Sequence, residues 1–463
     1  MAVNFLVNTS LEGVAIFDEQ RLGKTPTVLT ALKIKQATPL IVVPTSLLYP
    51  WKTEYLKWYN DDVVLITGSK EQRKLLYKQK KAMIISYTTL SNDIDLIMKL
   101  KHFDYIVIDE AHRIRNLKHS KKFKPKLATN LLKISRKIKN RIALTGTPAS
   151  NYADDVFGIL QFLYPDIFAS YYNFSDYYFK QETCYVRTPN GVDTISKCTG
   201  QFKDNKADEL LEFLDTISIQ RKRSEVMTWL PKYDITPVTL PMSSEQQKAY
   251  DMLNNVFEYK DTICLTTLEL MLALRQLTMS PELLKCDTQG CKFKFITEYL
   301  EDYPEKSVII VSTLVEPLKL LSKLLSPKQH EIVTGSTSAK NRDKIKNDFQ
   351  NKKYNLLLAN LDVIKEGFTL DTADTIIFLN SSYIYTDNIQ CMDRLVPVSQ
   401  ENVHKITQNI IILLAKDSID EYIYDMVYNK KASSSDIVNN YKNYRKETLC
   451  KQDLQQSKLK DLN

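Results

Sequence analysis

A Gly-Lys-Thr tripeptide at residues 23–25 is the first group in this chain that could do chemistry on phosphate. It follows a short apolar run, 14–17, and precedes a helix-like stretch, so strand, loop and helix come in the order of a phosphate-binding loop. In such a loop Lys24 and the backbone amides hold the phosphates, and the Thr25 hydroxyl coordinates Mg²⁺. The tripeptide alone is a weak indication, because Asp18 occupies the position of an earlier consensus glycine.

Two adjacent carboxylates, Asp109 and Glu110, follow another apolar run, 105–108. The carboxyl end of a parallel strand is where doubly wound sheets carry their chemistry. Asp109 would hold Mg²⁺, and Glu110 would deprotonate the water that attacks phosphate. The alternative is a pair of surface acids after a buried strand, but the Lys24 loop upstream favours a nucleotide site. A third apolar run, 141–144, ends in Thr-Gly-Thr-Pro, which either links the nucleotide site to a cleft or forms a simple turn.

Length and composition describe a protein of two or more domains without membrane segments. A chain of 463 residues exceeds what one hydrophobic core usually serves, and 43% hydrophobic with 25% charged residues is ordinary for soluble proteins. No apolar run reaches the length of a transmembrane helix, and the first residues do not form a secretory signal. Seven cysteines follow no repeating frame, so we expect reduced thiols in a soluble intracellular protein.

The charge distribution permits a polyanionic partner. The formal net charge is +8, and residues 118–141 contain ten Lys or Arg but no Asp or Glu. Such a run is usually a solvated helix face. Its position between two nucleotide-site motifs favours a surface that faces nucleic acid.

Three motifs in order give the chain a specific resemblance. Asp-Glu-x-x-Leu-Gly-Lys-Thr, Asp-Glu-Ala-His and Leu-Thr-Gly-Thr-Pro are similar to motifs I, II and III of superfamily-two helicases, and in detail to the Swi/Snf-type branch. Residues 43–51 resemble motif Ia of that branch, and 85–90 resemble the next motif that touches the DNA backbone. The similarity continues through residues 109–116, 151–179, 219–231, 243–250 and 274–281.

The second half of the chain resembles the second lobe of the same branch. Apolar runs at 307–312, 355–359 and 375–378 read as strands. Between and after them, residues 335–338 with Arg342 match a Gly-Ser-Thr-Ser…Arg block, 366–374 match motif V, and 390–400 match motif VI.

The resemblance implies an α/β fold of two tandem RecA-like P-loop lobes with helical protrusions between them. The expected ranges are 1–150 for lobe one, 151–290 for the protrusions and linker, 291–432 for lobe two, and 433–463 for a polar tail. ATP and Mg²⁺ are the implied cofactors, and double-stranded or branched DNA, held through its phosphates, is the implied partner.

The same resemblance assigns roles to individual residues. The catalytic set is Glu110, Asp109 and Arg394. The ATP-binding set is Gly23, Lys24, Thr25, Gly367 and Asp393, with Thr25 and Asp109 on Mg²⁺. The DNA-binding set is Pro44, Thr45, Ser46, Ser86, Tyr87, Thr313, Ser336 and Thr337.

Three departures from the family pattern affect the chemistry. Pro397 stands where the branch places its second motif VI arginine, the arginine finger, so hydrolysis depends on Arg394 or another cation, or is slow. Arg21 replaces a glycine of motif I. The seventeen residues before Asp18 contain no Gln, whereas the family reads adenine with a Gln-containing segment, which predicts that nucleotides besides ATP are accepted.

Three functions are compatible with these features. The first is an ATP-dependent DNA translocase or helicase that remodels forks, migrates branches or acts in replication, recombination or repair, in a bacterial cytoplasm or a phage-infected host cell. The second is a remodeller that displaces proteins such as RNA polymerase from DNA. The third is a nucleotide-gated DNA-binding protein with weak hydrolysis, for which Pro397 is the main support.

Overall fold

The computed structural model divides the chain into two compact units, Met1–Thr228 (unit 1) and Trp229–Asn463 (unit 2). The predicted protrusion and linker segment, 151–290, is therefore shared between the two units. The structure describes residues 1–463 except 21, 119–125, 149–152, 189–190, 228–233, 327, 366–369, 371, 395–408, 431, 433–436, 438–439 and 442–463.

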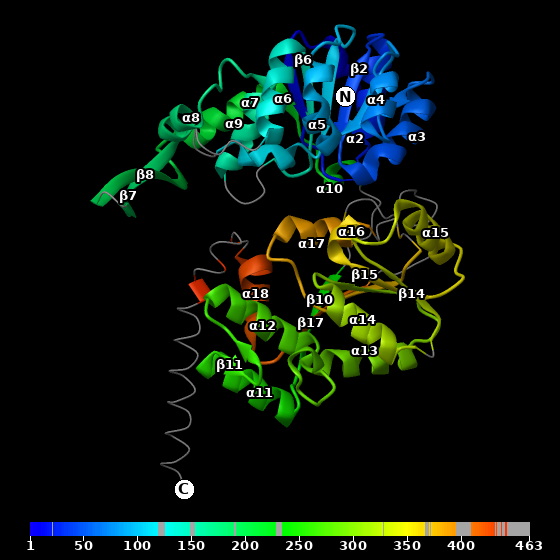
Figure 1. The fold of residues 1–463 in the computed structure, drawn as a ribbon, viewed down its shortest axis with the longest axis vertical. Coiled ribbons are helices and arrows are strands. Elements are labelled where there is room, and N and C mark those ends of the chain that lie inside the picture. The colour runs from blue at the N-terminus through cyan, green and yellow to red at the C-terminus, as the bar shows by residue number, and fades with distance from the viewer. Residues whose placement is uncertain are drawn as a thin grey trace. The chain divides into compact units, whose positions relative to one another are not determined.

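Unit 1 is built on a sheet of seven parallel strands in the order β3-β4-β2-β5-β6-β1-β9 (Figure 1). Its central strands are short apolar runs, as expected where helices cover both faces of a parallel sheet. The strands are β1 (Gly13–Ile16), β2 (Pro39–Val43), β3 (Val64–Leu65), β4 (Met83–Ser86), β5 (Tyr105–Asp109), β6 (Asn140–Leu144) and β9 (Ser218–Ile219).

Alternate residues of each strand face opposite sides of this sheet and belong to two separate cores. Val14 and Ile16 pack with the helices α1, α2 and α3, whereas Ala15 and Phe17 pack with α5, α6 and α7. The helices of unit 1 up to this point are α1 (Ala2–Asn8), α2 (Lys24–Ile34), α3 (Leu48–Trp58), α4 (Lys70–Leu76), α5 (Tyr87–Ile97), α6 (Lys126–Lys137) and α7 (Phe157–Leu163), with 3₁₀ turns η1 (Thr45–Leu47), η2 (Ala111–Lys118) and η3 (Ala153–Val156).

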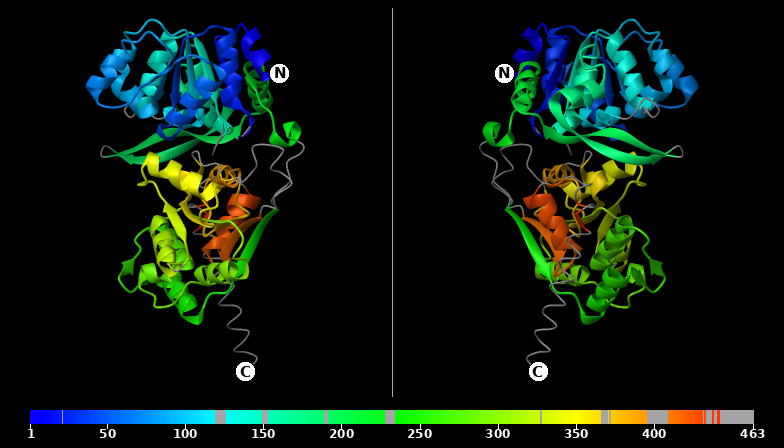
Figure 2. Two further views of the ribbon diagram at one scale, coloured as in Figure 1. Left: turned by 90° about the vertical axis from the view of Figure 1, so that its right-hand side faces the viewer. Right: turned by 90° about the vertical axis from the view of Figure 1, so that its left-hand side faces the viewer.

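After α7 the chain leaves the sheet and then returns to it. Helix α8 (Tyr171–Tyr178) leads into an antiparallel hairpin, β7 (Phe179–Thr188) and β8 (Gly191–Phe202), which Figure 2 shows as a long ribbon extending from unit 1. Helix α9 (Lys206–Ile217) brings the chain back, and β9 pairs with β1 beside the phosphate-binding loop. The short helix α10 (Arg223–Val226) ends the described part of unit 1.

Unit 2 contains a second parallel sheet, of six strands in the order β10-β17-β16-β13-β15-β14. The runs predicted as strands form β13, β15 and β16, whereas β10 is an edge strand that the apolar pattern did not predict. The strands are β10 (Asp234–Leu240), β13 (Val308–Ser312), β14 (His330–Val333), β15 (Leu356–Asn360), β16 (Thr375–Phe378) and β17 (Asn409–Ala415).

Helices pack around this second sheet, as the predicted α/β fold class requires. They are α11 (Ser244–Val256), α12 (Thr267–Met279), η4 (Pro281–Leu284), α13 (Cys291–Asp302), α14 (Val315–Leu324), α15 (Ala339–Gln350), α16 (Leu361–Lys365), α17 (Tyr385–Met392) and α18 (Ile419–Tyr424), with a small hairpin, β11 (Glu258–Tyr259) and β12 (Thr262–Ile263). Two α/β units, each with a parallel sheet, confirm the prediction from the sequence. Within the described residues, no helix is both long and apolar enough to cross a bilayer.

Candidate nucleotide site

The loop between β1 and α2 has the backbone of a phosphate-binding turn. Gly23, the residue before α2, has φ of +74°, a left-handed conformation that glycine adopts without strain. Lys24 begins the helix, and its ammonium donates to the carbonyls of Asp18 at 2.8 Å and Glu19 at 3.1 Å. The lysine charge therefore lies inside the loop, beside the N–H groups at the start of α2, where phosphate oxygens would be bound.

Asp18, which replaces a consensus glycine, is fully buried and forms an ion pair with Arg221. The Arg221 Nε lies 3.1 and 3.0 Å from the two carboxylate oxygens, and its Nη2 donates to one of them. This pairing compensates a charge that would otherwise be costly to bury. The Asp18 hydrogen bond raises the pKa of Arg221 above its usual value.

The backbone around Arg221 continues the sheet along the loop. Phe17 N–H donates to the Ile219 carbonyl at 2.8 Å, and Glu19 N–H donates to the Arg221 carbonyl at 3.1 Å. The Glu19 carboxylate accepts the Arg223 N–H at 2.7 Å. Residues 219–223 therefore hold the phosphate-binding loop in place through hydrogen bonds. From the resemblance to the family, they were expected only to be part of the linker. The sequence gives one signal for this contact, an Asp at a glycine position followed much later by Arg-Lys-Arg. That signal does not show which arginine pairs with Asp18.

Asp109 ends β5 as a buried carboxylate. One oxygen accepts the Trp51 indole N–H at 2.7 Å, and the other accepts the Glu110 N–H at 2.9 Å. Burial and then the neighbouring Glu110 charge raise the pKa of Asp109 to about 6, against the lowering effects of Trp51 and Lys24. A divalent cation would supply the charge that favours the ionised carboxylate, so the donor set fits Mg²⁺. Because Asp109 is only 8% exposed, it is not one of two surface acids.

Glu110 is held in a rare backbone conformation and is linked to the third motif. Its φ is +52°, a region that few residues other than glycine occupy and that active sites often use. Its carboxylate lies 3.3 Å from His112 Nδ1, which is also 3.2 Å from the Thr145 hydroxyl. The Thr145 oxygen in turn accepts the Thr147 N–H at 3.1 Å. The second and third motifs therefore form one polar chain across the ends of β5 and β6.

The predicted DNA-binding residues of unit 1 are of two kinds. Thr45 and Ser46 are exposed in the turn η1 that follows β2. Pro44, Ser86 and Tyr87 are buried. Ser86 caps α5 by accepting the Thr89 N–H at 3.1 Å, and the Tyr87 hydroxyl donates to the Asp109 carbonyl at 2.6 Å. The Tyr87 side chain is thus engaged within unit 1.

In unit 2 the corresponding residues follow the carboxyl ends of β13 and β14. Thr313 is fixed by Asn380, whose side chain accepts the Thr313 N–H at 2.9 Å and donates to its hydroxyl at 2.6 Å. Ser336 is exposed, and Thr337 lies in the same turn. Arg342 donates to the Thr337 carbonyl at 2.8 Å and so stabilises that turn. This edge is where open parallel sheets bind ligands.

Arg394 and Asp393 lie at the end of α17. Asp393 is buried, and Arg394 donates to the Lys365 carbonyl while its own carbonyl accepts the Leu370 N–H at 3.0 Å. Three other residues of the sequence hypotheses, Gly367, Arg21 and Pro397, lie outside the described residues. The tail at 433–463 lies largely outside them as well.

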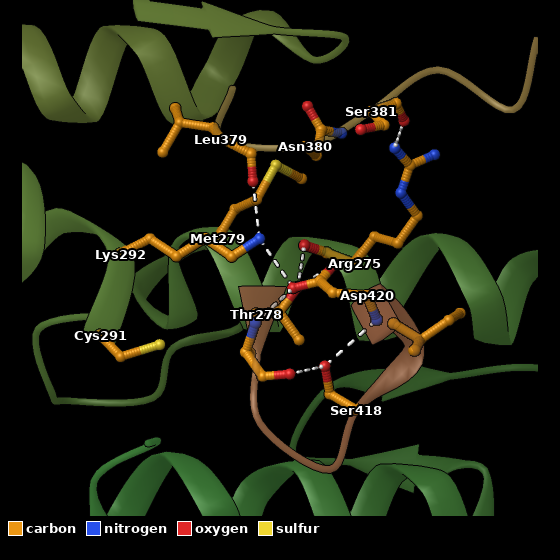
Figure 3. Close-up of polar contacts among 12 residues, drawn as sticks. Arg275, Thr278, Met279, Cys291, Lys292, Leu379, Asn380, Ser381, Ser418 and Asp420 are labelled. Carbon is orange, nitrogen blue, oxygen red and sulfur yellow. Dashed lines mark hydrogen bonds and ion pairs between the residues drawn. The ribbon is translucent and has the colours of Figure 1, made fainter. Parts of the chain in front are cut away.

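A buried polar network in unit 2 was not anticipated from the sequence (Figure 3). The Lys292 ammonium, fully buried, donates to the Leu379 carbonyl at 2.6 Å and pairs with Asp420 at 2.7 Å. Asp420 also accepts the Thr278 hydroxyl at 3.2 Å, and Arg275 donates to the Ser381 carbonyl at 2.5 Å. The network joins α12, α13 and α18 to segment 379–381, which contains the Asn380 that fixes Thr313.

Comparison with known proteins agrees with this geometry. The family description "SNF2-related domain" matches residues 1–283, and "Helicase conserved C-terminal domain" matches residues 291–396. The chain therefore belongs to the SNF2 family of helicase-like proteins, which confirms the predicted Swi/Snf-type branch and its two tandem RecA-like lobes.

Several relatives cover nearly the whole chain. An uncharacterized ATP-dependent helicase of Mycoplasma genitalium is 26% identical over 471 residues, 95% of this chain and 42% of that protein. The ISWI chromatin-remodeling complex ATPase ISW1 of Saccharomyces cerevisiae is 26% identical, with 92% and 39% covered. The DNA annealing helicase and endonuclease ZRANB3 of Bos taurus is 24% identical, with 94% and 39% covered. The chain thus spans about two fifths of the length of these relatives.

A solved structure with similarity along the chain is the Sulfolobus solfataricus SWI2/SNF2 ATPase core in complex with dsDNA. It is 23% identical, with 94% of this chain and 91% of that chain covered and a TM-score of 0.42.

Proposed function

We propose that this chain hydrolyses ATP and uses the energy to move along double-stranded or branched DNA. The observation that carries the proposal is the arrangement at the carboxyl edge of the unit 1 sheet. There the Lys24 loop, the carboxylates of Asp109 and Glu110, and the Thr145 hydroxyl end neighbouring parallel strands. Membership in the SNF2 family supports the same activity.

Each residue of unit 1 has a separate task in this proposal. Gly23, Lys24 and the amides at the start of α2 bind the phosphates, and Thr25 and Asp109 would hold Mg²⁺, which when bound offsets the phosphate charge. Glu110 accepts the proton of the attacking water. The Glu110 carboxylate contacts His112, which contacts the Thr145 hydroxyl, and these contacts hold the carboxylate in one orientation. A fixed orientation matters because a general base must lie within hydrogen-bond reach of the proton that it accepts.

We assign unit 2 a smaller part of the chemistry. Gly367 and Asp393 belong to the nucleotide-binding set, and Arg394 supplies the cation that stabilises charge in the transition state. With proline at position 397, Arg394 acts without a second motif VI arginine. An arginine finger contributes about 10³–10⁵ in kcat, so we expect slow turnover rather than none.

DNA is bound through its phosphates. Thr45 and Ser46 of unit 1 and Ser336 of unit 2 are exposed after strand ends and can donate hydroxyl hydrogens to phosphate oxygens. In unit 2, Thr313 and Thr337 are fixed by hydrogen bonds to their main chain. Contacts with phosphate ignore sequence and depend on salt. A binding constant for duplex DNA that is unaffected by salt between 50 and 200 mM, roughly the range over which phosphate contacts weaken most visibly, would contradict this part of the proposal.

The test is ATP hydrolysis with and without duplex or forked DNA, for the unsubstituted chain and for Lys24→Ala and Glu110→Gln. We expect DNA to stimulate the unsubstituted chain and both substitutions to abolish turnover, with Glu110→Gln still binding nucleotide. Equal rates in all three proteins would refute the proposal. Tight, nucleotide-dependent DNA binding without turnover would instead support the nucleotide-gated alternative that Pro397 suggests.

Substrate choice is resolved by comparing structures of DNA. Unwinding or branch migration on forks and junctions supports the branched-DNA function. Release of a stalled RNA polymerase from duplex DNA without branch unwinding supports the protein-displacing alternative.

A further inference from the structure

Asp109 is held by two aromatic side chains that reach it from different elements. The Trp51 indole N–H donates to its carboxylate at 2.7 Å, and the Tyr87 hydroxyl donates to its carbonyl at 2.6 Å. Trp51 is 2% exposed, Tyr87 is 6% exposed and Asp109 is 8% exposed. With the Glu110 N–H on the other carboxylate oxygen, the position of Asp109 depends directly on where Trp51 and Tyr87 lie.

Each aromatic donor belongs to a helix that begins at a predicted DNA contact. Trp51 is in α3, which directly continues the exposed turn of Thr45 and Ser46. Tyr87 is the first residue of α5, directly after the capping residue Ser86. With a rise of about 2.0 Å per residue in the 3₁₀ turn and about 1.5 Å in α3, Trp51 lies within ~10 Å of Thr45.

The local packing makes the start of α3 rigid. Leu48, Trp51 and Tyr55 are buried on one side of α3, and the Leu47 N–H donates to the Pro44 carbonyl in the turn before it. A force on the turn is therefore passed to Trp51 as a movement of the helix, since packed interiors transmit displacement. A buried indole needs some acceptor, and a main-chain carbonyl would suffice for that need. Here the acceptor is the carboxylate assigned to Mg²⁺.

We propose that Trp51 and Tyr87 are positioning residues that connect the DNA-facing starts of α3 and α5 to Asp109. Through them, contact with DNA sets the position of the Asp109 carboxylate, which is assigned to Mg²⁺. This inference rests on the proposed DNA-stimulated ATPase. It places the coupling between DNA and hydrolysis inside unit 1, in two hydrogen bonds. Asp109 remains the catalytic residue, and the two aromatic residues act through it.

The first test removes each donor and keeps the ring. Trp51→Phe removes the hydrogen bond to the Asp109 carboxylate, and Tyr87→Phe removes the one to the Asp109 main-chain carbonyl. Each substitution should lower the ratio of DNA-stimulated to basal kcat by about tenfold, because a lost hydrogen bond that positions a catalytic residue acts mainly on the transition state. The KM for ATP should change by less than about threefold, since the phosphate loop is intact. The half-saturating Mg²⁺ concentration should rise.

An exposed tryptophan at the other end of α3 provides a matched control. Trp58 is 40% exposed and donates its indole N–H to Glu54 at 2.7 Å. Trp58→Phe should keep the full stimulation ratio. A lower ratio in this control, or an unchanged ratio in both Trp51→Phe and Tyr87→Phe, overturns the inference.

The second test follows Trp51 directly and needs no turnover. The chain has three tryptophans, so Trp58→Phe with Trp229→Phe leaves Trp51 as the only tryptophan, which can be excited selectively over tyrosine. Adding duplex DNA without nucleotide should shift or quench its emission, and Asp109→Ala in this background should remove much of that response. DNA that binds, as judged by anisotropy of labelled duplex, without changing Trp51 emission overturns the inference.

The two tests separate this inference from the proposed function. If the unsubstituted chain lacks ATPase activity, the proposed function fails, and the Trp51 emission experiment still decides whether DNA contact reaches Asp109. If DNA stimulates hydrolysis but Trp51→Phe keeps the full ratio, the function stands and the coupling is refuted. Should Trp51→Phe fail to fold by circular dichroism, Tyr87→Phe and the emission experiment carry the decision.

Discussion

Removing Arg221 should weaken both the stability of unit 1 and its affinity for nucleotide. Asp18 is fully buried, and the Arg221 side chain that pairs with it is 23% exposed. Breaking a buried ion pair by removing one partner costs about 3–5 kcal/mol, because the remaining charge is left without compensation. Since Arg221 is partly reached by solvent, Arg221→Ala should cost ~3 kcal/mol, at the lower end of that range.

The effect should extend to the nucleotide because the carbonyls of Asp18 and Glu19 are the groups that Lys24 contacts. A loop whose first residue carries an unpaired buried charge will rearrange. The backbone amides that bind the phosphates will then lose their alignment. We expect at least about a tenfold rise in the Kd of a fluorescent ATP analogue, equivalent to about 1.4 kcal/mol. Denaturant unfolding and analogue titration measure the two effects.

A double-mutant cycle gives the decisive control. Asp18→Gly restores the consensus glycine and removes the buried charge, so Arg221→Ala should cost much less in that background than in the unsubstituted chain. Arg221→Lys keeps a charge but cannot reproduce the two-pronged contact, and should lie between. If the two single substitutions simply add in the double variant, Asp18 and Arg221 are not coupled and the reasoning is refuted.

Three further predictions concern single sites. Without metal, the raised pKa of Asp109 means that the folded state holds its proton more tightly than the unfolded chain, so the ionised carboxylate destabilises unit 1 above about pH 6 and this cost disappears as pH falls towards 3.8. In EDTA, Asp109→Asn should stabilise the protein clearly more at pH 7.5 than at about pH 4.5, and an equal effect at both pH values would contradict this. Lys292→Met should destabilise unit 2 by about 3–5 kcal/mol, and Lys292→Met with Asp420→Leu should recover most of it in denaturant unfolding; no recovery would argue against a paired charge. Gly13→Ala would bring a Cβ to 2.6 Å from the Leu163 carbonyl oxygen, so the melting temperature should fall by several degrees, whereas an unchanged value would show that α7 moves freely.

The ATP-binding motifs and the central strands that read as apolar runs could be predicted because their signals are local. A strand buried on both faces of a parallel sheet reads as a short apolar run, and 105–108, 141–144 and 375–378 all form strands as predicted. Asp109 follows such a run directly and Lys24 follows one after the loop 18–23, so their place at the carboxyl edge follows from the sequence. Their order along the chain identified the family.

The tertiary structure decided features that depend on residues far apart in the chain. Strand β10 is half exposed and carries a proline, so only its pairing with β17 makes it a strand. The division between the units falls at Thr228, whereas the sequence grouped 151–290 as one segment. Sequence assigned Tyr87 to the DNA contacts, but the fold turns its side chain inward to Asp109.

The ion pairs were equally out of reach of the sequence. Arg221 and Asp18 are 203 residues apart, and 63 basic and 55 acidic residues offer thousands of possible pairs. Which pair forms is decided by the return of β9 to the first sheet and by the burial of Asp18, both consequences of long-range packing. The sequence by itself therefore determined the family and the strands that read as apolar runs, and it predicted the residues of the chemistry. Only the tertiary structure decided which side chains hold those residues in place, because such contacts depend on packing between distant segments rather than on local periodicity.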